Sequence, residues 1–424
     1  MGRGTKLGLV ASLAIISSPV AASGDPLAAI WPLFDEGRDL SAVEQLRALA
    51  FRKDGSVANP LAEDMWEQLS PRLEGLAVAA PIERGDARKP AAAEDIAAVQ
   101  SAERRDAIDT IVDRARDRRI VILNEEHDAP EDRAFGLAVA KALRPLGFTM
   151  LAAEAFTNDK DPANTDVTAL AARGYPIRKT GTYIGDPVFG DFVRQALALG
   201  YKPIAYEETA EQRSANGGDR IDRREEAEAS NLTTAILRAP QTKFLIYVGY
   251  SHATEMPIRE EDNEKVHLWM AGRLKQKTGL DPLTIDQTGL GAENPLQSSR
   301  LLRGIVQRQG ISRPVILFSG GKPLPVGRYR DAIDLQVIHP VTHVIHGRPD
   351  WLLTMGRHPV RPAPNLVPKT GKALVQAFLS SEGSDAVPVD QAVLEPGDTR
   401  WFMLPDKPVR FVVKESFPAS AAVP

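Results

Sequence analysis

The chain has 424 residues, of which 25% are charged and 43% are hydrophobic, and its formal net charge is -4 at pH 7. This composition is that of an ordinary globular protein, and its slightly acidic balance gives no electrostatic footprint for nucleic acid. Because the chain contains no cysteine, disulfides, thiol nucleophiles and thiolate zinc sites are excluded.

Residues 1–22 have the pattern of a secretory signal peptide. Arg3 and Lys6 come before the apolar run 7–16, and small residues follow it up to Ala22, where we expect cleavage. A membrane anchor is the weaker alternative, because the apolar run is shorter than the roughly 20 residues that cross a bilayer. We therefore expect a periplasmic or secreted protein with no membrane span after signal cleavage.

Residues 23–104 are expected to form a helical N-terminal extension. Apolar residues recur at intervals of three and four within 40–51 and 61–76, and 81–93 reads as a connector rich in alanine and proline. We expect this extension to pack on the main domain, and no candidate site residue is identified in it.

Helical and strand patterns alternate through residues 105–356. Amphipathic stretches at 105–118, 131–146, 188–197, 219–238 and 264–277 each precede a short aliphatic or β-branched run, at 120–123, 149–153, 203–206, 244–248 and 283–285. This alternation predicts an α/β fold with a mostly parallel central sheet and helices on both faces. The runs 314–318 and 332–338 are expected to extend the sheet.

The remaining residues, 357–424, change in character. Four prolines within 357–368 indicate a linker, and short strand patterns separated by turn residues follow it. A small β-rich C-terminal domain is therefore predicted.

Polar side chains stand at the carboxyl ends of the predicted strands. In an open parallel sheet these ends share one edge, so groups that are far apart in sequence could converge there. Two imidazoles and several carboxylates suit either a divalent metal ion with nitrogen and oxygen ligands, or a metal-free site in which histidine takes a proton from water. The side chains are Glu125 with His127, Glu154, Glu207, His252 after Gly249, and Asp286.

A functional role is not expected for all of these residues. A polar residue after a strand usually caps a helix or binds a loop, and we favour that simpler interpretation for Glu207 and Asp286. For His127, Glu154 and His252 we favour a functional role.

The two histidine motifs resemble those of a known superfamily. Asn124-Glu-Glu-His-Asp128 resembles the Gly-Glu-x-His-Asp signature of ChaN-like haem-binding proteins, with Asn124 in place of the glycine. Gly249-Tyr-Ser-His252 is similar to the second Gly-x-x-His motif of the same superfamily, which includes TraB, the Tiki metalloproteases and the erythromycin esterases. Glu154 matches the strand-end glutamate, Arg224 is similar to an arginine on the preceding helix, and the resemblance covers about residues 105–290.

The resemblance implies several chemistries. Tiki-like members are metal-dependent proteases, esterase-like members use a histidine as general base, and ChaN binds haem. By resemblance, His127, Glu154 and His252 would be catalytic, and a metal ion would take Glu125 together with these three. Tyr250 and Arg224 would bind a cofactor or substrate, although an ion pair between Arg224 and Glu228 is an equal alternative.

We therefore expect an exported hydrolase acting on a peptide, an ester or another small-molecule substrate, with or without a divalent metal ion. The alternative is a haem-binding or metal-binding protein of the ChaN type without turnover. A third hypothesis is an interaction module that has kept the fold and lost its chemistry, so whether the chain is an enzyme stays open.

A rival constellation places Ser251 in a nucleophile elbow, with Asp286 and His339 following in the order serine, acid, histidine. The elbow needs a helix that starts at the serine, whereas Pro257 indicates a loop, and Ala253 replaces the closing glycine. We expect Ser251 not to be a nucleophile.

Two further patterns are weak. His339, His343 and His346 would share a face of a helix, but Pro340 predicts extended chain, in which His343 and His346 point in opposite directions. Residues 319–322 lack the glycine spacing of a nucleotide-binding loop and read as a turn.

Overall fold

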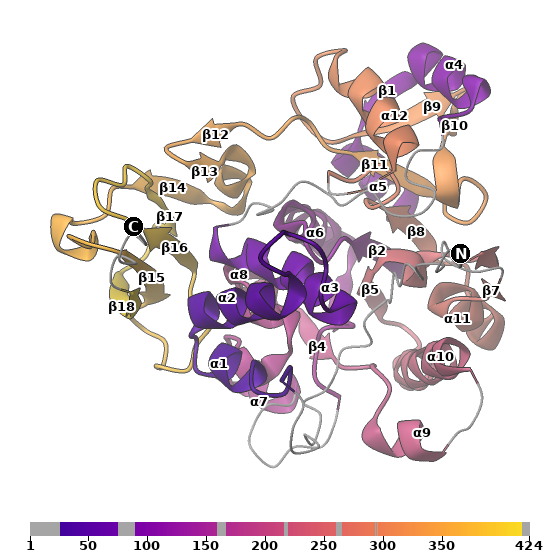
Figure 1. Cartoon of the computed structure of the whole chain (residues 1–424). Coiled ribbons are helices and arrows are strands. Elements are labelled where there is room, and N and C mark those ends of the chain that lie inside the picture. The colour runs from indigo at the N-terminus through magenta and orange to yellow at the C-terminus, as the bar shows by residue number, and fades with distance from the viewer. Residues whose placement is uncertain are drawn as a thin grey trace, which may run out of the picture.

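The computed structural model describes residues 26–74, 90–158, 167–215, 219–259, 265–292, 294 and 296–417. The predicted signal peptide and most of the predicted connector lie outside these residues. Within the described chain, no helix combines the length and the apolar content needed to cross a bilayer. Figure 1 shows a central sheet surrounded by helices, with the β-rich C-terminal part at one side of the molecule and α4 and α12 at another.

A nine-stranded sheet forms the centre of the molecule, in the order β1-β9-β11-β8-β2-β5-β3-β4, and β10 also pairs with β9. From β11 to β4 all neighbours are parallel, whereas β1, β10 and β11 pair with β9 in antiparallel fashion. The predicted α/β fold with a mostly parallel sheet is therefore confirmed. The strands are β1 (Glu103–Asp106), β2 (Ile120–Glu125), β3 (Phe148–Ala153), β4 (Lys202–Ile204), β5 (Lys243–Gly249), β8 (Leu283–Asp286), β9 (Val315–Ser319), β10 (Lys322–Pro323) and β11 (Leu335–Ile338).

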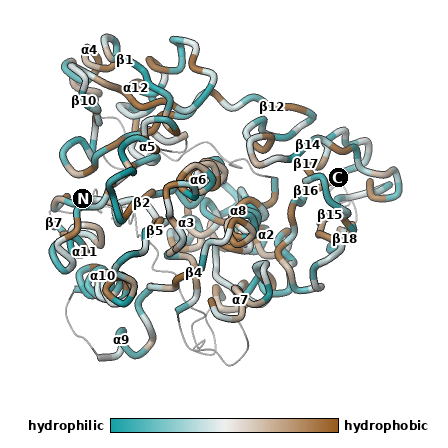
Figure 2. The backbone as a smooth tube through the Cα atoms, turned by 180° about the vertical axis from the view of Figure 1, so that it is seen from behind, coloured by the Kyte–Doolittle hydropathy of each residue, from teal (hydrophilic) through white to brown (hydrophobic). Residues whose placement is uncertain are grey.

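Helices cover both faces of this sheet because its middle strands are apolar on both sides. In β2, Ile120 and Ile122 belong to the hydrophobic cluster under α10 and α11, while Val121 and Leu123 belong to the larger cluster under α5, α6 and α8. Figure 2 shows from behind that teal and brown alternate along these helices. The helices α5 and α10 bury one side, whereas most residues of α6 and α8 are buried. The helices are α5 (Ala107–Ala115), α6 (Pro130–Leu143), α8 (Pro187–Ala198), α10 (Arg220–Arg238) and α11 (Met270–Thr278).

The predicted N-terminal extension is helical and divides between two parts of the molecule. Its first helices join the larger hydrophobic cluster through residues such as Leu46 and Trp66, whereas Val99 of α4 packs with Leu302 of α12. The extension therefore shares the core of the main domain. Its elements and α12 are α1 (Trp31–Asp35), α2 (Asp39–Ala50), α3 (Pro60–Leu69), η1 (Ser70–Leu73), α4 (Ala93–Ser101) and α12 (Gln297–Gln307).

The C-terminal part forms the predicted small β domain, but the prediction of a linker at 357–368 is wrong for its first residues, which form β14 and pair with β17. An antiparallel sheet has the order β16-β15-β18, and β14 pairs with β17. Arg357 of β14 forms a buried ion pair with Asp191 of α8 at 3.0 Å, and Glu415 of β18 accepts the backbone N–H of Leu40 at 2.9 Å. These contacts join the β domain to the main domain and to the extension. The strands are β14 (Arg357–Val360), β15 (Lys372–Leu379), β16 (Asp390–Leu394), β17 (Phe402–Pro405) and β18 (Val409–Phe417).

The remaining elements are short and connect the larger ones. They are α7 (Val167–Arg173), α9 (Ala210–Ala215), β6 (Ile258–Arg259), β7 (Val266–His267), β12 (Val344–Ile345), β13 (Arg348–Pro349) and the 3-10 turns η3 (Arg144–Leu146), η4 (Arg178–Thr180), η5 (Tyr183–Gly185), η6 (Tyr250–Ala253), η7 (Gly327–Tyr329), η8 (Asp350–Met355) and η9 (Pro364–Leu366).

Candidate functional site

The structure brings the two histidine motifs and the strand-end glutamate to one edge of the sheet. The parallel register of β2 and β5 places Glu125 beside Gly249, and the N–H of Gly249 donates to Oε2 of Glu154 at 2.6 Å. The imidazole of His127 lies against Gly249, because a Cβ added there would meet its Cε1 at 2.6 Å. His252 follows in η6, with Nε2 3.7 Å from Oε1 of Glu154. The predicted convergence at the carboxyl ends of the strands is confirmed.

His127 is held by a buried carboxylate and an arginine. Its Nδ1 lies 3.1 Å from Oε1 of Glu125, and Arg133 of α6 donates two hydrogen bonds to Glu125, at 2.9 and 3.1 Å. Arg133 also donates to the carbonyl of His127 at 2.7 Å and to Asp186 at 2.5 Å. Burial raises the pKa of Glu125, but Arg133 and His127 outweigh burial and hold that pKa below its usual value.

An anionic Glu125 accepts a hydrogen bond from an Nδ1–H group of His127. In the neutral ring the unprotonated nitrogen is therefore Nε2. Within the described residues this Nε2 makes no hydrogen bond, and it faces Gly249 and Glu154. A histidine with one nitrogen fixed by a carboxylate and the other available is arranged as a general base.

Two tyrosines enclose the imidazole of His127. Tyr183 of η5 stacks on the ring with centroids 4.2 Å apart, and Tyr250 meets it edge-on at 5.0 Å. The backbone of Tyr250 has a φ of 36°, a conformation that costs energy for a residue with a side chain. Asn124 stabilises this conformation by donating to the carbonyl of Tyr250 at 2.9 Å. The residue that replaces the motif's glycine therefore fixes the loop that carries His252.

The predicted cofactor role of Tyr250 is not favoured by its surroundings. Its hydroxyl accepts the backbone N–H of His127 at 3.2 Å, and burial together with Asp128 raises its pKa well above the usual value. A tyrosine that binds haem iron does so as tyrosinate, which this environment disfavours.

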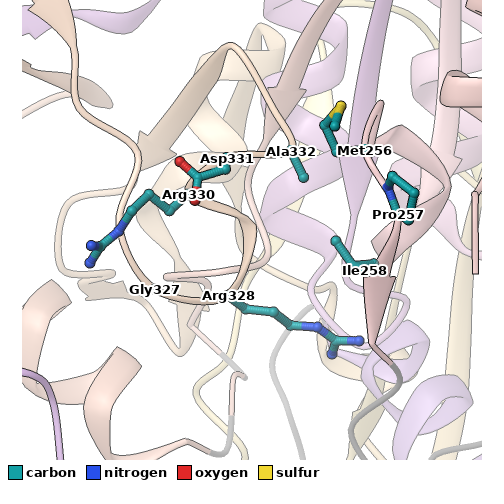
Figure 3. A pocket seen from close by; sticks show the side chains of 8 residues that line it. All are labelled: Met256, Pro257, Ile258, Gly327, Arg328, Arg330, Asp331 and Ala332. Atoms are coloured by element: carbon teal, nitrogen blue, oxygen red, sulfur yellow. The ribbon is translucent and has the colours of Figure 1, made fainter. Parts of the chain in front are cut away.

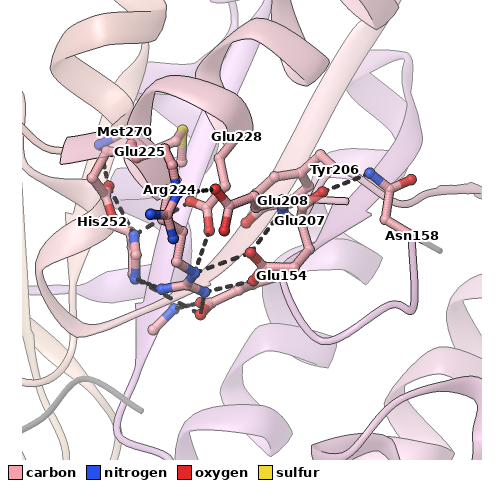
Figure 4. A network of polar contacts seen from close by, with 12 residues as sticks. Glu154, Asn158, Tyr206, Glu207, Glu208, Arg224, Glu225, Glu228, His252 and Met270 are labelled. Atoms are coloured by element: carbon pink, nitrogen blue, oxygen red, sulfur yellow. Dashed lines mark hydrogen bonds and ion pairs between the residues drawn. The ribbon is translucent and has the colours of Figure 1, made fainter. Parts of the chain in front are cut away.

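Arg224 of α10 is the centre of a second network (Figure 4). Its guanidinium donates to Glu154 at 2.6 Å and to both carboxylate oxygens of Glu207, at 2.6 and 3.0 Å. Its Nη1 lies 3.0 Å from Nε2 of His252, and its Nε lies 3.1 Å from Glu228, so the predicted ion pair with Glu228 is also present. Arg224 is therefore buried in the site and is not a helix-surface residue.

The charges of this network support one another. Burial raises the pKa of Glu154, but His252 and Arg224 outweigh it, so the pKa of Glu154 lies below its usual range and the side chain is anionic. Burial lowers the pKa of His252, but Glu225 and Glu154 raise it above the usual value. Above that pKa the ring is neutral, and because a guanidinium only donates, the contact with Arg224 then requires an unprotonated Nε2 on His252.

The predictions for the other two strand ends had different outcomes. The simpler interpretation of Asp286 is confirmed, because its carboxylate accepts the N–H groups of Thr288 and Gly289 in the next loop. For Glu207 the simpler interpretation describes only part of its contacts. Its Oε1 accepts the N–H of Glu208 at 2.7 Å, but both of its carboxylate oxygens also bind Arg224.

The four residues predicted as metal ligands do not form one ligand set in this structure. Glu125 is bound to Arg133, while Glu154 and His252 both contact Arg224, so a fixed cation already faces their donor atoms. Three groups of described residues bring single ligand atoms within 4.8 Å of one another, and none contains more than one of the four predicted ligands. These groups are Glu225, Glu228 and His252; Glu154, Glu207 and Glu228; and Asp219, Asp222 and His267.

The rival constellations are not assembled. Ser251 lies in η6 with its Oγ 3.0 Å from the hydroxyl of Tyr329, while Nε2 of His339 lies 3.0 Å from Gln287. In the described chain no contact joins Ser251 to His339. His343 is exposed and flanks the β12–β13 hairpin, whereas His339 is buried, so the histidine trio does not form a cluster.

Sequence analysis did not identify Arg133, Tyr183 or Glu225 as site residues. Arg133 and Glu225 stand in the helix that follows the first motif and the helix that precedes the second, within runs of mixed charge that usually mark a solvated surface. Nothing in the sequence around Tyr183 indicates that it stacks on His127.

A half-open pocket of about 380 Å³ lies at the opposite end of the loop that carries His252 (Figure 3). Met256 and Ile258 form one wall, and Arg328 and Asp331 form the other. None of the predicted site residues lines it.

The fold and the site define an α/β protein with a buried histidine and carboxylate site at the carboxyl edge of its sheet. No protein-family model matches the chain, and no curated protein matches it. Among solved structures, the chain is similar to RRSP, a MARTX toxin effector domain from Vibrio vulnificus CMCP6. The identity is 18%, the match covers 46% of this chain and 38% of that chain, and the TM-score is 0.32.

Two further structures are described as bacterial protein toxins. One has 13% identity, with 46% of this chain and 38% of that chain covered, and the other has 16%, with 60% and 57% covered; both TM-scores are 0.29. The chain thus spans less than two thirds of each of these chains. TM-scores this low support no inference about activity.

Proposed function

We propose that this protein is a hydrolase that activates water with His127 and cleaves a peptide or ester bond. The observation that carries the proposal is the arrangement of His127. Its Nδ1 is fixed by Glu125, which Arg133 holds in turn, and its Nε2 faces Gly249 and Glu154 with no hydrogen bond in the described chain.

In this reaction Nε2 of His127 takes a proton from a water molecule, whose oxygen attacks the carbonyl carbon of the substrate. The resulting tetrahedral intermediate collapses, the bond to the leaving nitrogen or oxygen breaks, and His127 returns its proton to that atom. Glu125 stabilises the imidazolium that forms in between, as the buried carboxylate of a catalytic triad does.

Arg224 supplies positive charge beside Glu154, and His252 holds one of its guanidinium nitrogens in place by accepting a hydrogen bond. A fixed guanidinium in a buried site stabilises developing negative charge on an oxygen without reorganisation. Glu154 contacts both groups and accepts the N–H of Gly249, so it sets their position relative to His127.

The resemblance of both motifs to ChaN-like, Tiki and erythromycin-esterase proteins supports the choice of a hydrolase, and the signal-peptide pattern supports export to the periplasm or the medium. We propose a metal-free reaction, because Arg224 competes with any metal ion for Glu154 and His252. The haem-binding alternative keeps the same crevice and predicts a visible absorption band.

The experiment compares purified wild-type protein with His127→Ala against panels of chromogenic esters and fluorogenic peptides. His343→Ala is the matched control, because its side chain is 74% exposed and pairs with Asp350, which is not part of the site. We expect turnover that falls at least 100-fold in His127→Ala, a loss of the order that general base catalysis contributes. The control should keep wild-type activity, and a chelator should change nothing.

Equal turnover by wild type and His127→Ala would reject His127 as the base. Loss of activity with chelator, restored by a divalent ion, would reject the metal-free reaction. A haem absorption band in the purified protein, lost in His127→Ala and His252→Ala, would favour the carrier instead.

A further inference from the structure

Glu225 is a buried carboxylate in direct contact with the second histidine. It is 1% exposed, and its Oε2 lies 3.0 Å from Nδ1 of His252. The same oxygen accepts the backbone N–H of Met270, the first residue of α11, at 2.7 Å (Figure 4). One oxygen of a side chain on α10 therefore contacts both the imidazole and the start of the next helix.

The neighbouring Glu228 is the less suitable partner for His252. Its Oε2 lies 3.4 Å from Nδ1, beyond good hydrogen-bond distance, and neither of its oxygens accepts a hydrogen bond. Burial raises the pKa of Glu228 well above its usual value, with Glu207 and Glu225 adding to the effect of burial against Arg224. Glu225, whose Oε2 is closer to Nδ1 and also accepts a backbone N–H, is therefore the acceptor at Nδ1.

The other side of the imidazole is also fixed. Trp269 precedes α11 and meets the ring of His252 edge-on, with centroids 5.4 Å apart and planes at 85°. Nε2 then faces Arg224 at 3.0 Å, with Glu154 at 3.7 Å. The ring therefore has one carboxylate at Nδ1 and one arginine at Nε2.

From these contacts we infer that Glu225 is a positioning residue that holds His252 in the Nδ1–H tautomer, with Nε2 directed at Arg224 and Glu154. The arrangement repeats the one at His127, where Glu125 holds Nδ1. In both cases the carboxylate is itself fixed by a donor from a helix, Arg133 of α6 for Glu125 and the first N–H of α11 for Glu225.

The tautomer matters because Arg224 can only donate. If the proton of the neutral ring moved to Nε2, that N–H would face a guanidinium N–H at 3.0 Å, and the contact would become repulsive. Either His252 or Arg224 would then move, and Arg224 also holds Glu154. The influence of Glu225 on the reaction rests on the proposed hydrolase function, but its influence on the tautomer does not.

The experiment compares Glu225→Ala with Glu226→Ala in the full-length protein. Glu226 is the adjacent residue on the same helix, is about half exposed and pairs with Arg273 and Lys277 at the surface, so it matches the loss of charge without touching His252. The first measurement is the long-range proton–nitrogen NMR spectrum of histidine-labelled protein, which distinguishes the two tautomers. His252 is assigned by the loss of its signals in His252→Gln.

At a pH above the raised pKa of His252, where the ring is neutral, we expect Nδ1–H for His252 in the wild type and in Glu226→Ala, and a shift to Nε2–H or to a mixture in Glu225→Ala. Nε2–H in the wild type, or an unchanged tautomer in Glu225→Ala, would overturn the inference. If Glu225→Ala does not fold, Glu225→Leu with the same readout replaces it, because leucine fills a similar volume without an acceptor.

The second measurement is turnover of the substrate found for the proposed reaction. We expect kcat to fall about 10- to 100-fold in Glu225→Ala with KM nearly unchanged, since second partners of functional histidines have effects of this size, and no change in Glu226→Ala. Glu225→Gln keeps an oxygen acceptor and should retain more activity than Glu225→Ala. An altered tautomer together with unchanged kcat would leave the positioning role intact and count against the role of His252 in the proposed function.

Discussion

Gly249→Ala tests the contact on which the proposed site depends. Gly249 has φ -89° and ψ 147°, an extended conformation that alanine adopts without strain. The added methyl group is therefore the whole perturbation. Its carbon would lie 2.6 Å from Cε1 and 2.8 Å from Nε2 of His127, and 3.2 Å from Oε2 of Glu154.

The size of the effect follows from these distances. Ordinary van der Waals contact begins at 3.4 Å, so the imidazole must move by about 0.8 Å, the difference between 3.4 and 2.6 Å. The ring cannot move freely, because Tyr183 stacks on it at 4.2 Å and Glu125 holds Nδ1. A misplacement near 1 Å can cost about 100-fold in rate, and overpacking a buried site typically costs about 1–3 kcal/mol in stability.

The assay measures kcat/KM and the free energy of unfolding in urea for Gly249→Ala and for Gly304→Ala as a control. Gly304 lies inside α12, where the nearest atom to an added Cβ is the flexible end of Arg308 at 3.1 Å. We expect Gly249→Ala to lose about 100-fold in kcat/KM while remaining folded, and Gly304→Ala to keep full activity with up to about 1 kcal/mol of added stability. Wild-type kcat/KM in Gly249→Ala would refute the assignment of His127 as the base.

Further predictions concern stability and the neighbouring groups. Burial, with a contribution from Arg303, lowers the pKa of His339 to about 4, so the folded state resists a proton that the unfolded chain accepts near 6.5. The contribution of neutral His339 to stability is therefore fully present above pH 6.5 and is lost as the pH falls toward 4, by about 2 kcal/mol at pH 5. The free energy of unfolding in urea should be lower at pH 5.0 than at pH 7.5, and this difference should be smaller in His339→Gln. Arg133→Lys keeps the charge but loses the paired hydrogen bonds to Glu125, so kcat should fall about 10-fold or more. A wild-type kcat in this variant would show that the paired hydrogen bonds are not needed. Ser251→Ala should keep turnover within about threefold and lose about 1 kcal/mol of stability; complete loss of turnover would revive the serine nucleophile.

The meeting of His127, Glu154 and His252 could be predicted because it depends on topology. Each follows a strand that is apolar on both faces, and the alternation of strands with helices makes those strands parallel. Parallel strands share a carboxyl edge whatever the details of packing. The sequence therefore carries enough information for the edge and for these three side chains, and the resemblance adds Glu125 and Arg224, but neither predicts Arg133, Tyr183 or Glu225.

The partners depend on packing that no local pattern records. Glu225 stands in a run of five consecutive charged residues on α10, 222–226, which resembles a solvated helix surface in sequence, and Arg224 in the same run is predicted only by the resemblance. Only the packing of α11 and η6 against α10 buries one side of that run. The sequence also gave no reason to expect a site contact from the N-terminal extension. In the structure Gln68 of α3 accepts a hydrogen bond from the hydroxyl of Tyr183, the residue that stacks on His127.

The position of Arg224 explains both why a metal ion would have to compete for Glu154 and His252 and why so many carboxylates lie together. Glu154, Glu207 and Glu228 present ligand atoms within 4.8 Å of one another, an arrangement that needs either a cation or protonation to be stable. Arg224 is the cation, and it binds Glu154 and Glu207 through hydrogen bonds. The raised pKa of Glu228 favours the protonated, neutral form of that side chain. A guanidinium is fixed by the fold and cannot dissociate as a metal ion does, so its charge is present in every molecule. An arginine at this point therefore gives the carboxylates the electrostatic support that a bound cation would give, and the proposed reaction uses the histidines for hydrogen bonding and proton transfer.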